Sequence, residues 1–231
     1  MVAIGSLILE CTRRCNLQCA HCLRGCAENK DMNPKVLEKL KESVGQIYTV
    51  SFSGGEPMLN PKVIHQYNKY FKNCTGLFFI ATNGTIYSPD AMSALVELFA
   101  HCEEPEICCL AVSRDQFRDE LDYRELQRYQ AYSFYSDSTK NGDIKYVINS
   151  GLAIENGVGV IAPKIHYQLE VKKQDENTTI EEIYINVNGD VLASCDLSYE
   201  DREELSLGNI LEESLEEIIE REIARIEALM V

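Results

Sequence analysis

The sequence has little positive charge, no long apolar run and no internal repeat. Its 22 Lys and Arg residues face 37 Asp and Glu residues, which gives the 231-residue chain a net charge of −15. A phosphate backbone repels such an acidic chain, so we expect no non-specific binding to nucleic acid. No apolar stretch approaches the roughly 18 residues that a membrane span requires. The start of the chain, Met1–Leu9, also lacks a basic leader, so we expect a cytoplasmic protein with no membrane partner.

Cysteine is abundant by contrast, with ten residues. Thiols of a cytoplasmic protein stay reduced, so these cysteines are expected to bind metal or remain free rather than form disulfides. Three of them, Cys15, Cys19 and Cys22, form C-x3-C-x2-C after the apolar run Ile4–Leu9. Such short spacing predicts a loop folded around one object. Because thiolates are soft ligands, that object is a soft metal or an iron–sulfur cluster.

The motif supplies three thiols, although a closed metal site has four ligands. The missing ligand leaves one metal position open, which indicates chemistry rather than a structural role. Arg13, Arg14 and Arg24 flank the loop, and we expect their charge to offset that of an anionic thiolate cluster. The alternative is a structural zinc site, whose fourth ligand would be one of the neighbouring residues Cys11, Cys26 and His21.

A second motif, Ser-Gly-Gly-Glu-Pro at Ser53–Pro57, follows the next predicted strand, Ile47–Phe52. A structural zinc site would not account for it. Its glycines let the backbone approach a ligand closely, and its carboxylate stands where an ammonium group could bind. Together with C-x3-C-x2-C one βα unit upstream, the motif resembles the radical S-adenosylmethionine (SAM) enzymes over roughly residues 4–115.

The resemblance implies two cofactors and assigns residues to them. The three motif cysteines would ligate a [4Fe-4S] cluster, whose fourth iron takes the amino and carboxylate groups of SAM. Gly54, Gly55 and Glu56 would contact the SAM amine. The cluster would donate one electron to cleave SAM into methionine and a 5′-deoxyadenosyl radical, which abstracts hydrogen from a substrate. The cofactors carry this chemistry, and the protein supplies ligands, orientation and a dry pocket.

Four further residues stand at positions that the family uses around SAM. His21 lies between the last two ligands, where the family has an aromatic residue beside the adenine, and an imidazole can stack there. Asn83 follows a third predicted strand, and Ser113 and Asp115 follow a fourth, where the family contacts the ribose. From the residues alone, Asn83 fits a turn cap equally, Ser113 and Asp115 fit a helix cap before Gln116, and Asp115 could face substrate.

The first part of the chain alternates predicted strands with predicted helices. The strands are Ile4–Leu9, Ile47–Phe52, Leu77–Ala81 and Ile107–Val112, and the helices cover about 34–44, 60–71, 88–99 and 116–132. This spacing implies right-handed βαβ units and a parallel sheet, with the site residues gathered at the carboxyl ends of the strands. We therefore predict an α/β fold: a partial (β/α) barrel of the radical SAM type with a short C-terminal extension of β-hairpin plus helix.

The extension begins after short strands predicted at 144–148, 157–161 and 165–171. Ile180–Val187 and Val191–Ala193 are predicted to pair through a type I′ turn at Asn188-Gly189. An amphipathic helix should follow Leu207–Ile210. This tail resembles the SPASM extension of radical SAM peptide maturases, which binds auxiliary clusters through several cysteines. Only Cys195 stands here, so we predict a reduced extension without auxiliary clusters, at 166–231, after a core domain at 1–165. The alternative is a second cluster that recruits distant cysteines, namely Cys74, Cys102, Cys108 or Cys109.

The resulting prediction is a radical SAM enzyme that modifies a peptide or protein and receives electrons from a flavodoxin or ferredoxin. Other enzymatic alternatives are an activase of a glycyl-radical enzyme, against which the tail argues, and an enzyme acting on a small molecule or nucleotide. The alternative from another class is a non-catalytic iron–sulfur or zinc adaptor. An adaptor has no use for Gly-Gly-Glu-Pro, so its Glu56→Ala variant should behave normally.

Overall fold

A computed structural model describes residues 1–118, 121–136, 145–174 and 177–229. Its strands are β1 (Val2–Thr12), β2 (Val44–Gly54), β3 (Thr75–Thr82), β4 (Cys109–Val112), β5 (Tyr135–Ser136), β6 (Val171–Gln174), β7 (Asn177–Ile185), β8 (Asp190–Leu192) and β9 (Gly208–Asn209). Its α-helices are α1 (Lys35–Ser43), α2 (Pro61–Phe71), α3 (Pro89–Phe99), α4 (Leu126–Tyr129), α5 (Leu152–Glu155), α6 (Asp201–Glu204) and α7 (Leu215–Leu229). Short 3-10 turns occupy Pro57–Leu59, Lys72–Cys74 and Pro105–Ile107.

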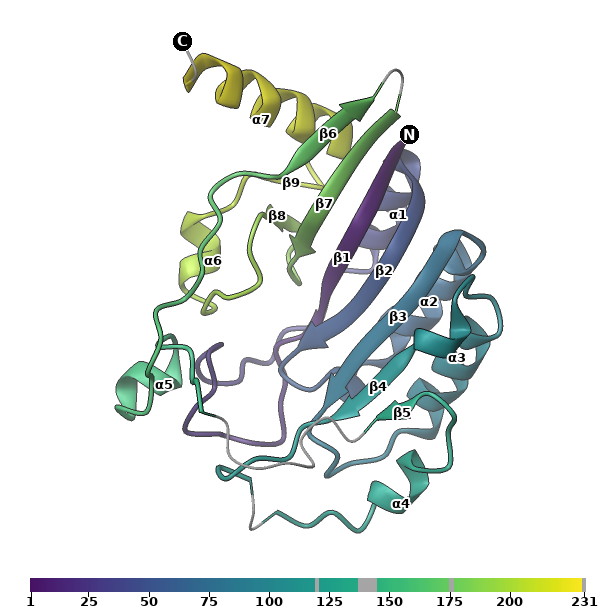
Figure 1. The fold of residues 1–231 in the computed structure, drawn as a ribbon, viewed down its shortest axis with the longest axis vertical. Coiled ribbons are helices and arrows are strands. Elements are labelled where there is room, and N and C mark those ends of the chain that lie inside the picture. The colour runs from purple at the N-terminus through teal and green to yellow at the C-terminus, as the bar shows by residue number, and fades with distance from the viewer. Residues whose placement is uncertain (119–120, 137–144, 175–176, 230–231) are drawn as a thin grey trace.

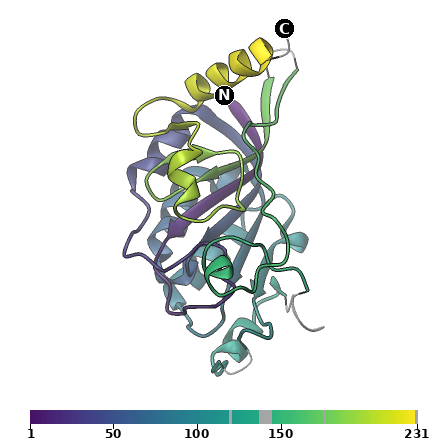
Figure 2. The ribbon, with the colours of Figure 1, turned by 90° about the vertical axis from the view of Figure 1, so that its left-hand side faces the viewer.

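All the described strands belong to one open sheet. Their order is β5-β4-β3-β2-β1-β7-β8-β9, and β6 pairs with β7 outside this path. Strands β1 to β5 are parallel to their neighbours, and β7 is parallel to β1 on its other side. Helices α1, α2 and α3 cover one face, as Figures 1 and 2 show together. The predicted α/β fold with a partial barrel is confirmed.

The core lies between the sheet and these helices. Successive strand side chains point to opposite faces, so Leu7 and Leu9 of β1 are buried on the helix side while Ile8 faces the open side. Helices α1 and α2 bury apolar stripes that include Leu40 and Ile64. Burying one such side chain stabilises the fold by about 1.5–3 kcal/mol. This packing holds the carboxyl ends of the parallel strands together at one edge.

The helix predicted at 116–132 is wrong. Among its described residues only α4 is α-helical. The Asp115 carboxylate accepts a hydrogen bond from the Phe117 N–H at 3.0 Å, and the Asp115 carbonyl accepts one from the Arg118 N–H at 2.8 Å. A side chain that bonds its own backbone favours a turn over a helix. Strand β4 is also shorter than predicted, because the 3-10 turn at Pro105–Ile107 precedes it.

The three short strands predicted after residue 143 are largely wrong. Ile148 and Ile161 form an isolated bridge, and Ile144 lies outside the described residues. The backbone around α5 forms turns instead, because the Ala153 carbonyl accepts hydrogen bonds from both Val158 and Gly159. Of the segment predicted at 165–171, only the last residue belongs to a strand, β6.

The β7–β8 hairpin is confirmed, but its turn differs from the expected type I′. Asn186 and Asp190 pair through a backbone hydrogen bond of 3.1 Å, so three residues rather than two form the loop. Gly189 has a φ of +92°, as in a type I turn followed by a left-handed residue. The Asn186 side chain explains the difference, because its Oδ1 accepts hydrogen bonds from the N–H groups of Asn188 and Asp190.

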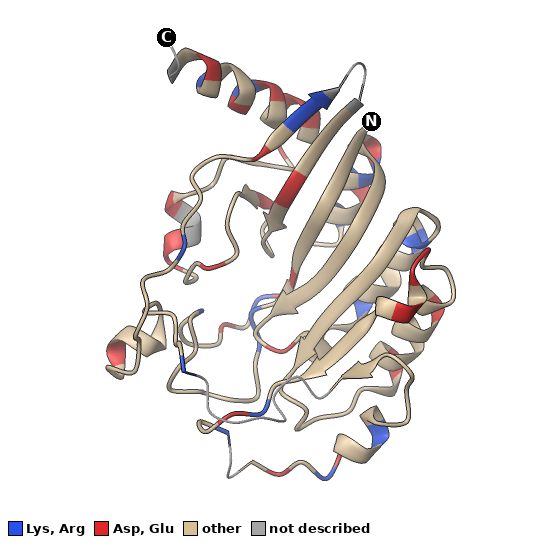
Figure 3. Ribbon diagram, in the orientation of Figure 1, with Lys and Arg blue, Asp and Glu red and all other residues tan. Residues whose placement is uncertain are grey.

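The extension shares the sheet of the core. Ile180, Ile183 and Ile185 of β7 are fully buried. Helix α7 lies beyond β6 and carries many acidic residues (Figure 3), and its buried Glu222 pairs with Arg225 at 2.7 Å. The division into domains at 1–165 and 166–231 stays a prediction.

Candidate functional site

The cysteine loop leaves β1 and folds around a pocket at the carboxyl ends of β1, β2 and β3. Cys15, Cys19 and Cys22 are free, partly buried and line this pocket together, which holds about 490 Å³ of empty space. A backbone hydrogen bond of 3.0 Å from Cys22 to Cys19 folds the loop between the last two thiols. Burial raises the pKa of Cys15. We call this space the thiol pocket.

The two glycines of the second motif let the end of β2 lie against the start of the cysteine loop. Gly55 donates a backbone hydrogen bond to Thr12 at 2.8 Å, and Glu56 donates one to Arg14 at 2.8 Å. A Cβ on Gly54 would lie 2.1 Å from the Thr12 carbonyl oxygen, and Gly54 has a φ of +136°. A side chain at this position would push the two loops apart.

The Glu56 carboxylate is buried at the base of the site, with 1% of the residue exposed. It accepts hydrogen bonds from the Thr82 hydroxyl and the Asn83 N–H, each at 2.8 Å, and from the Met58 N–H at 3.2 Å. Burial raises its pKa, although these hydrogen bonds oppose the effect. In this geometry the carboxylate joins the end of β2 to the end of β3.

Asn83 connects the same strand end to the cysteine loop. Its amide group donates to the Asn16 side chain at 2.9 Å, and its Oδ1 accepts from the N–H and hydroxyl of Thr85. Asn83 therefore caps its own turn, as one interpretation of the sequence predicted, while it also lines the thiol pocket.

His21 packs inside the protein beside the fourth strand end. Its ring stacks on Phe117 with centroids 4.5 Å apart, and its Nε2 lies 3.7 Å from an Asp115 oxygen. Burial is the largest effect on the pKa of His21 and lowers it, together with the charge of Arg118, while Asp115 acts in the opposite direction. The His21 Nδ1 is buried and has no hydrogen-bond partner among the described residues.

A second cavity lies next to the thiol pocket, over the sheet face that α1 to α3 leave uncovered (Figures 1 and 2). It holds about 1070 Å³ of empty space, and Cys22, Gly55 and Arg118 line both cavities. Its other lining residues include His21, Gly54, Ser113, Ser51, Ser53, Phe79 and Cys195. We call it the sheet-face cavity. Glu56 and Asp115 lie behind the lining residues. Glu56 accepts a hydrogen bond from Asn83, and Asp115 pairs with Arg118.

Comparison with known proteins identifies the family. The family model of the radical SAM superfamily matches residues 9–128, which is more than half of the chain. The chain belongs to the radical SAM superfamily. A second model, the SPASM iron-sulfur cluster-binding domain, matches residues 178–228 and confirms the SPASM-like extension. Membership implies a [4Fe-4S] cluster and SAM as cofactors.

Two individual proteins illustrate the relationship. An uncharacterized protein of Methanocaldococcus jannaschii, MJ0907, is 35% identical over 100 residues, which cover 40% of this chain and 35% of that protein. This radical SAM chain thus aligns with about a third of the length of that relative. The structure of histidine-tagged anSMEcpe with bound AdoMet has the same fold, with a TM-score of 0.54 and 16% identity over 94% of this chain and 80% of that one.

The residues present fit the cofactors of a radical SAM enzyme. In a three-cysteine [4Fe-4S] site each thiolate binds a different iron, and three free thiols around one pocket suit that arrangement. In the described part of the chain no three His, Cys, Asp or Glu side chains converge on a position for a single ion. The described residues also include no helix that is both long and apolar enough to cross a bilayer.

Arg118 is a site residue that the sequence did not reveal, because it lies inside the segment wrongly predicted as a helix. Its guanidinium group pairs with Asp115 and hydrogen-bonds to Cys19. Burial works against its charge, but Cys19 and Asp115 outweigh burial and raise the pKa of Arg118. The Arg118 Nε is buried without a partner among the described residues. No motif in the sequence marks it.

The arginines that flank the radical SAM motif differ in their partners. Arg14 pairs with Asp31 at 2.8 Å, and Arg13 pairs with Glu10 and with Glu28. Carboxylates therefore neutralise two of the three charges that were expected to offset a thiolate cluster. Arg24 donates instead to backbone carbonyls, and among the described residues it has no carboxylate partner within ion-pair distance.

Proposed function

We propose that this radical SAM enzyme binds its cluster through Cys15, Cys19 and Cys22 and modifies a peptide or protein in the sheet-face cavity. One observation carries the proposal: Cys22 and Gly55 line both cavities, so the thiol pocket lies next to the sheet-face cavity. When bound, the cluster and SAM supply a 5′-deoxyadenosyl radical that removes a hydrogen atom from a substrate. The proposal includes a cytoplasmic location and an electron donor such as a flavodoxin or ferredoxin.

The chain's own residues would bind and orient the cofactors and shield them from water. Gly55 lines both cavities and Gly54 lines the sheet-face cavity beside it, so their backbone carbonyl oxygens could accept hydrogen bonds from an amino acid ammonium group. Ser113 supplies a hydroxyl at the end of β4 for the ribose. His21 stacks on Phe117 and lines the sheet-face cavity, where it would lie beside the adenine.

Glu56, Asn83 and Asp115 support the loops around the site. Their described hydrogen bonds go to neighbouring protein groups, which they hold in position. The role implied by the family resemblance for Glu56, a direct contact with the SAM amine, requires a second partner for a carboxylate oxygen that already accepts a hydrogen bond. A carboxylate has about four acceptor sites, so the three bonds present leave room for that contact.

A peptide or protein substrate is supported by the extension. The SPASM model matches 178–228, and the tail resembles that of radical SAM peptide maturases. The cavity walls on β2 to β4 carry small side chains, Ser51, Ser53, Ala81 and Ser113, which leave space above the strands for a substrate segment. Cys195 is the one cysteine in 178–228, so the chain has too few thiols there for an auxiliary cluster of the usual four cysteines.

The cluster assignment is tested by replacing each motif cysteine with alanine. We expect Cys15→Ala, Cys19→Ala and Cys22→Ala each to lose most bound iron after anaerobic reconstitution, because each removes one of three ligands. Cys26→Ala is the matched control, since Cys26 is an exposed cysteine of the same loop that does not line the thiol pocket. Full iron content in the three variants would refute the assignment.

The substrate class is tested separately with the reconstituted wild-type protein. Candidate precursor peptides should raise 5′-deoxyadenosine release above the rate without substrate, and mass spectrometry should find a modified peptide. Free nucleosides and small metabolites serve as the comparison. Stimulation by one of these and not by peptides would favour the enzyme acting on small molecules or nucleotides.

A further inference from the structure

The two ends of the cysteine loop contact the C-terminal extension. At the first end, the Arg13 guanidinium lies over the ring of Tyr199 at 4.6 Å from its centroid. Arg13 is 1% exposed and pairs with Glu10 at 3.3 Å. The Glu10 carboxylate also accepts a hydrogen bond of 3.1 Å from the N–H of Val187 in the hairpin loop. The attraction between a cation and an aromatic face is stronger when both groups are removed from water.

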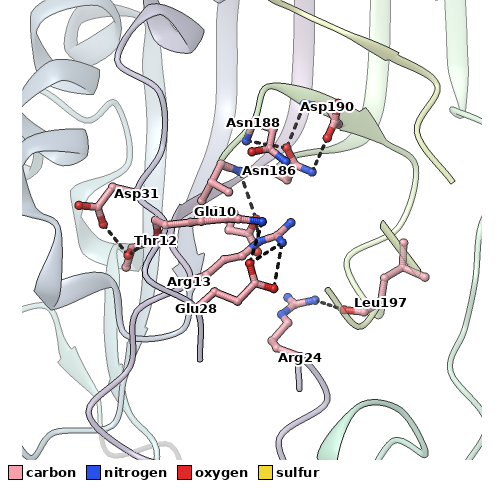
Figure 4. Close-up of polar contacts among 12 residues, drawn as sticks. Glu10, Thr12, Arg13, Arg24, Glu28, Asp31, Asn186, Asn188, Asp190 and Leu197 are labelled. Carbon is pink, nitrogen blue, oxygen red and sulfur yellow. Dashed lines mark hydrogen bonds and ion pairs between the residues drawn. The ribbon is translucent and has the colours of Figure 1, made fainter. Parts of the chain in front are cut away.

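At the second end, Arg24 is held by backbone and ring atoms of the same extension. Its Nη1 donates to the carbonyl of Cys195 and, at 2.9 Å, to that of Leu197. The Arg24 carbonyl accepts a hydrogen bond of 2.9 Å from the N–H of Tyr199, and its guanidinium lies 5.4 Å from the centroid of the Tyr184 ring. Figure 4 shows Arg24 reaching to Leu197 of the extension.

All three motif cysteines lie between these two arginines. Resting on the proposed function, we propose that the extension clamps the cluster-binding loop, with Arg13 and Arg24 as positioning residues. The clamp consists of Arg13, Arg24, Tyr199 and the carbonyls of Cys195 and Leu197. It fixes the separation of the loop ends and thereby the geometry of the three thiols. This gives a role to an extension that has too few cysteines for a cluster of its own.

Arg24 also differs from the other flanking arginines in charge. Arg13 and Arg14 are paired with carboxylates, whereas the partners of Arg24 are carbonyls and a ring. Arg24 has no carboxylate partner within ion-pair distance among the described residues, and Arg24 and Cys22 both line the sheet-face cavity. A nearby positive charge favours the more negative, reduced form of a cluster, so Arg24 raises the reduction potential.

The test uses variants at each end of the clamp. Arg24→Ala removes the second end and Arg24→Lys keeps the charge and hydrogen-bond donors. Tyr199→Leu removes the aromatic face under Arg13, and Tyr199→Phe keeps it. Arg225→Ala is the matched control, because Arg225 also donates to a backbone carbonyl within the extension, that of Tyr167 at 2.7 Å, without contacting the cysteine loop.

Two measurements are made on each variant. Amide hydrogen exchange of residues 13–24 is followed in the cluster-free protein, and loss of the reconstituted cluster to an iron chelator is followed together with its reduction potential. We expect faster exchange and about 10–100-fold weaker cluster retention in Arg24→Ala and Tyr199→Leu, as for other residues that orient metal ligands. Arg24→Ala should also move the potential to a more negative value. Arg24→Lys, Tyr199→Phe and Arg225→Ala should remain near wild type.

The proposal is overturned if Arg24→Ala and Tyr199→Leu keep wild-type exchange in 13–24 and wild-type cluster retention. It is equally overturned if Arg225→Ala changes hydrogen exchange and cluster retention as strongly as Arg24→Ala does, since the effect would then be general destabilisation. A wild-type protein that binds no cluster would refute the proposed function instead. In that case hydrogen exchange in the cluster-free protein still decides whether the clamp holds the loop.

Discussion

At the scale of single residues, the buried Glu56 carboxylate has a structural role whatever the substrate. It is the common acceptor for groups on the 3-10 turn after β2 and at the end of β3, namely Met58, Thr82 and Asn83. An adaptor protein with this fold would need the same acceptor. Loss of function in Glu56→Ala therefore does not by itself separate an enzyme from an adaptor, contrary to the simple expectation from the motif.

Glu56→Ala should lower the unfolding free energy of the cofactor-free protein by about 1–3 kcal/mol or more, because it leaves buried donors without an acceptor. Chemical denaturation in the absence of iron measures the change. Thr82→Val removes one of the three hydrogen bonds and should lower the unfolding free energy by less than Glu56→Ala does. A Glu56→Ala variant as stable as wild type would contradict the structural role of this carboxylate.

The raised pKa of Glu56 predicts that the stability of the protein depends on pH. Burial raises the folded-state pKa of Glu56 above the ordinary value of 4.5. Its contribution to stability is therefore full below the unfolded-state pKa and falls as the pH rises through the folded-state pKa. The difference in unfolding free energy between wild type and Glu56→Ala should shrink as the pH rises above about 4.5. A difference that grows over this range would contradict the raised pKa.

At the scale of elements, the sequence predicted regular segments well and side-chain-directed turns poorly. Strands β1 to β3 and helices α1 to α3 follow from apolar periodicity, because their packing against one another agrees with local preference. The wrong helix at 116–132 and the wrong turn at 188–189 have a common cause. In each, one side chain, Asp115 or Asn186, bonds to nearby backbone and selects a turn.

The sequence predicted only part of the candidate site. Cys15 to Cys22 and the Gly-Gly-Glu-Pro turn are contiguous motifs, so spacing reveals them. Arg118 and Tyr199 reach the site from distant segments, and no local pattern in the sequence points to such contacts. Tertiary packing also decides which of the flanking arginines pair with carboxylates and which one binds backbone carbonyls.

Asn186→Ala should open the β7–β8 loop. Asn186 is fully buried, and the variant leaves the N–H groups of Asn188 and Asp190 without their acceptor, at a cost of about 1–3 kcal/mol. Thermal unfolding of the cofactor-free protein measures the loss. The exposed neighbour provides the control, since Asn188→Ala should change stability by less than about 0.5 kcal/mol. Equal effects of the two substitutions would refute this account of the turn.

At the scale of the whole molecule, the extension and the radical SAM core form one continuous sheet. Strand β7 pairs with β1 over most of its length, and the clamp adds a second connection beside the cysteine loop. The extension therefore stabilises the strand from which the cysteine loop leaves. Because β1 and β7 pair across the predicted boundary near residue 165, we expect the two predicted domains not to fold independently.

Truncation to residues 1–165 should abolish cooperative folding. It exposes the edge of β1 and removes the fully buried Ile180, Ile183 and Ile185 from the core. Circular dichroism and thermal unfolding of the fragment provide the measurement, with the full chain as reference. A fragment that unfolds cooperatively would show that the predicted core domain is independent of the extension.

The most direct test of the central claim is an anaerobic assay of SAM cleavage. The protein is reconstituted with iron and sulfide, reduced with dithionite in the presence of SAM, and assayed for 5′-deoxyadenosine. The account predicts about four irons per chain and release of 5′-deoxyadenosine that depends on Cys15, Cys19 and Cys22. Stoichiometric zinc, or a cluster that never cleaves SAM even with candidate substrates present, would contradict it.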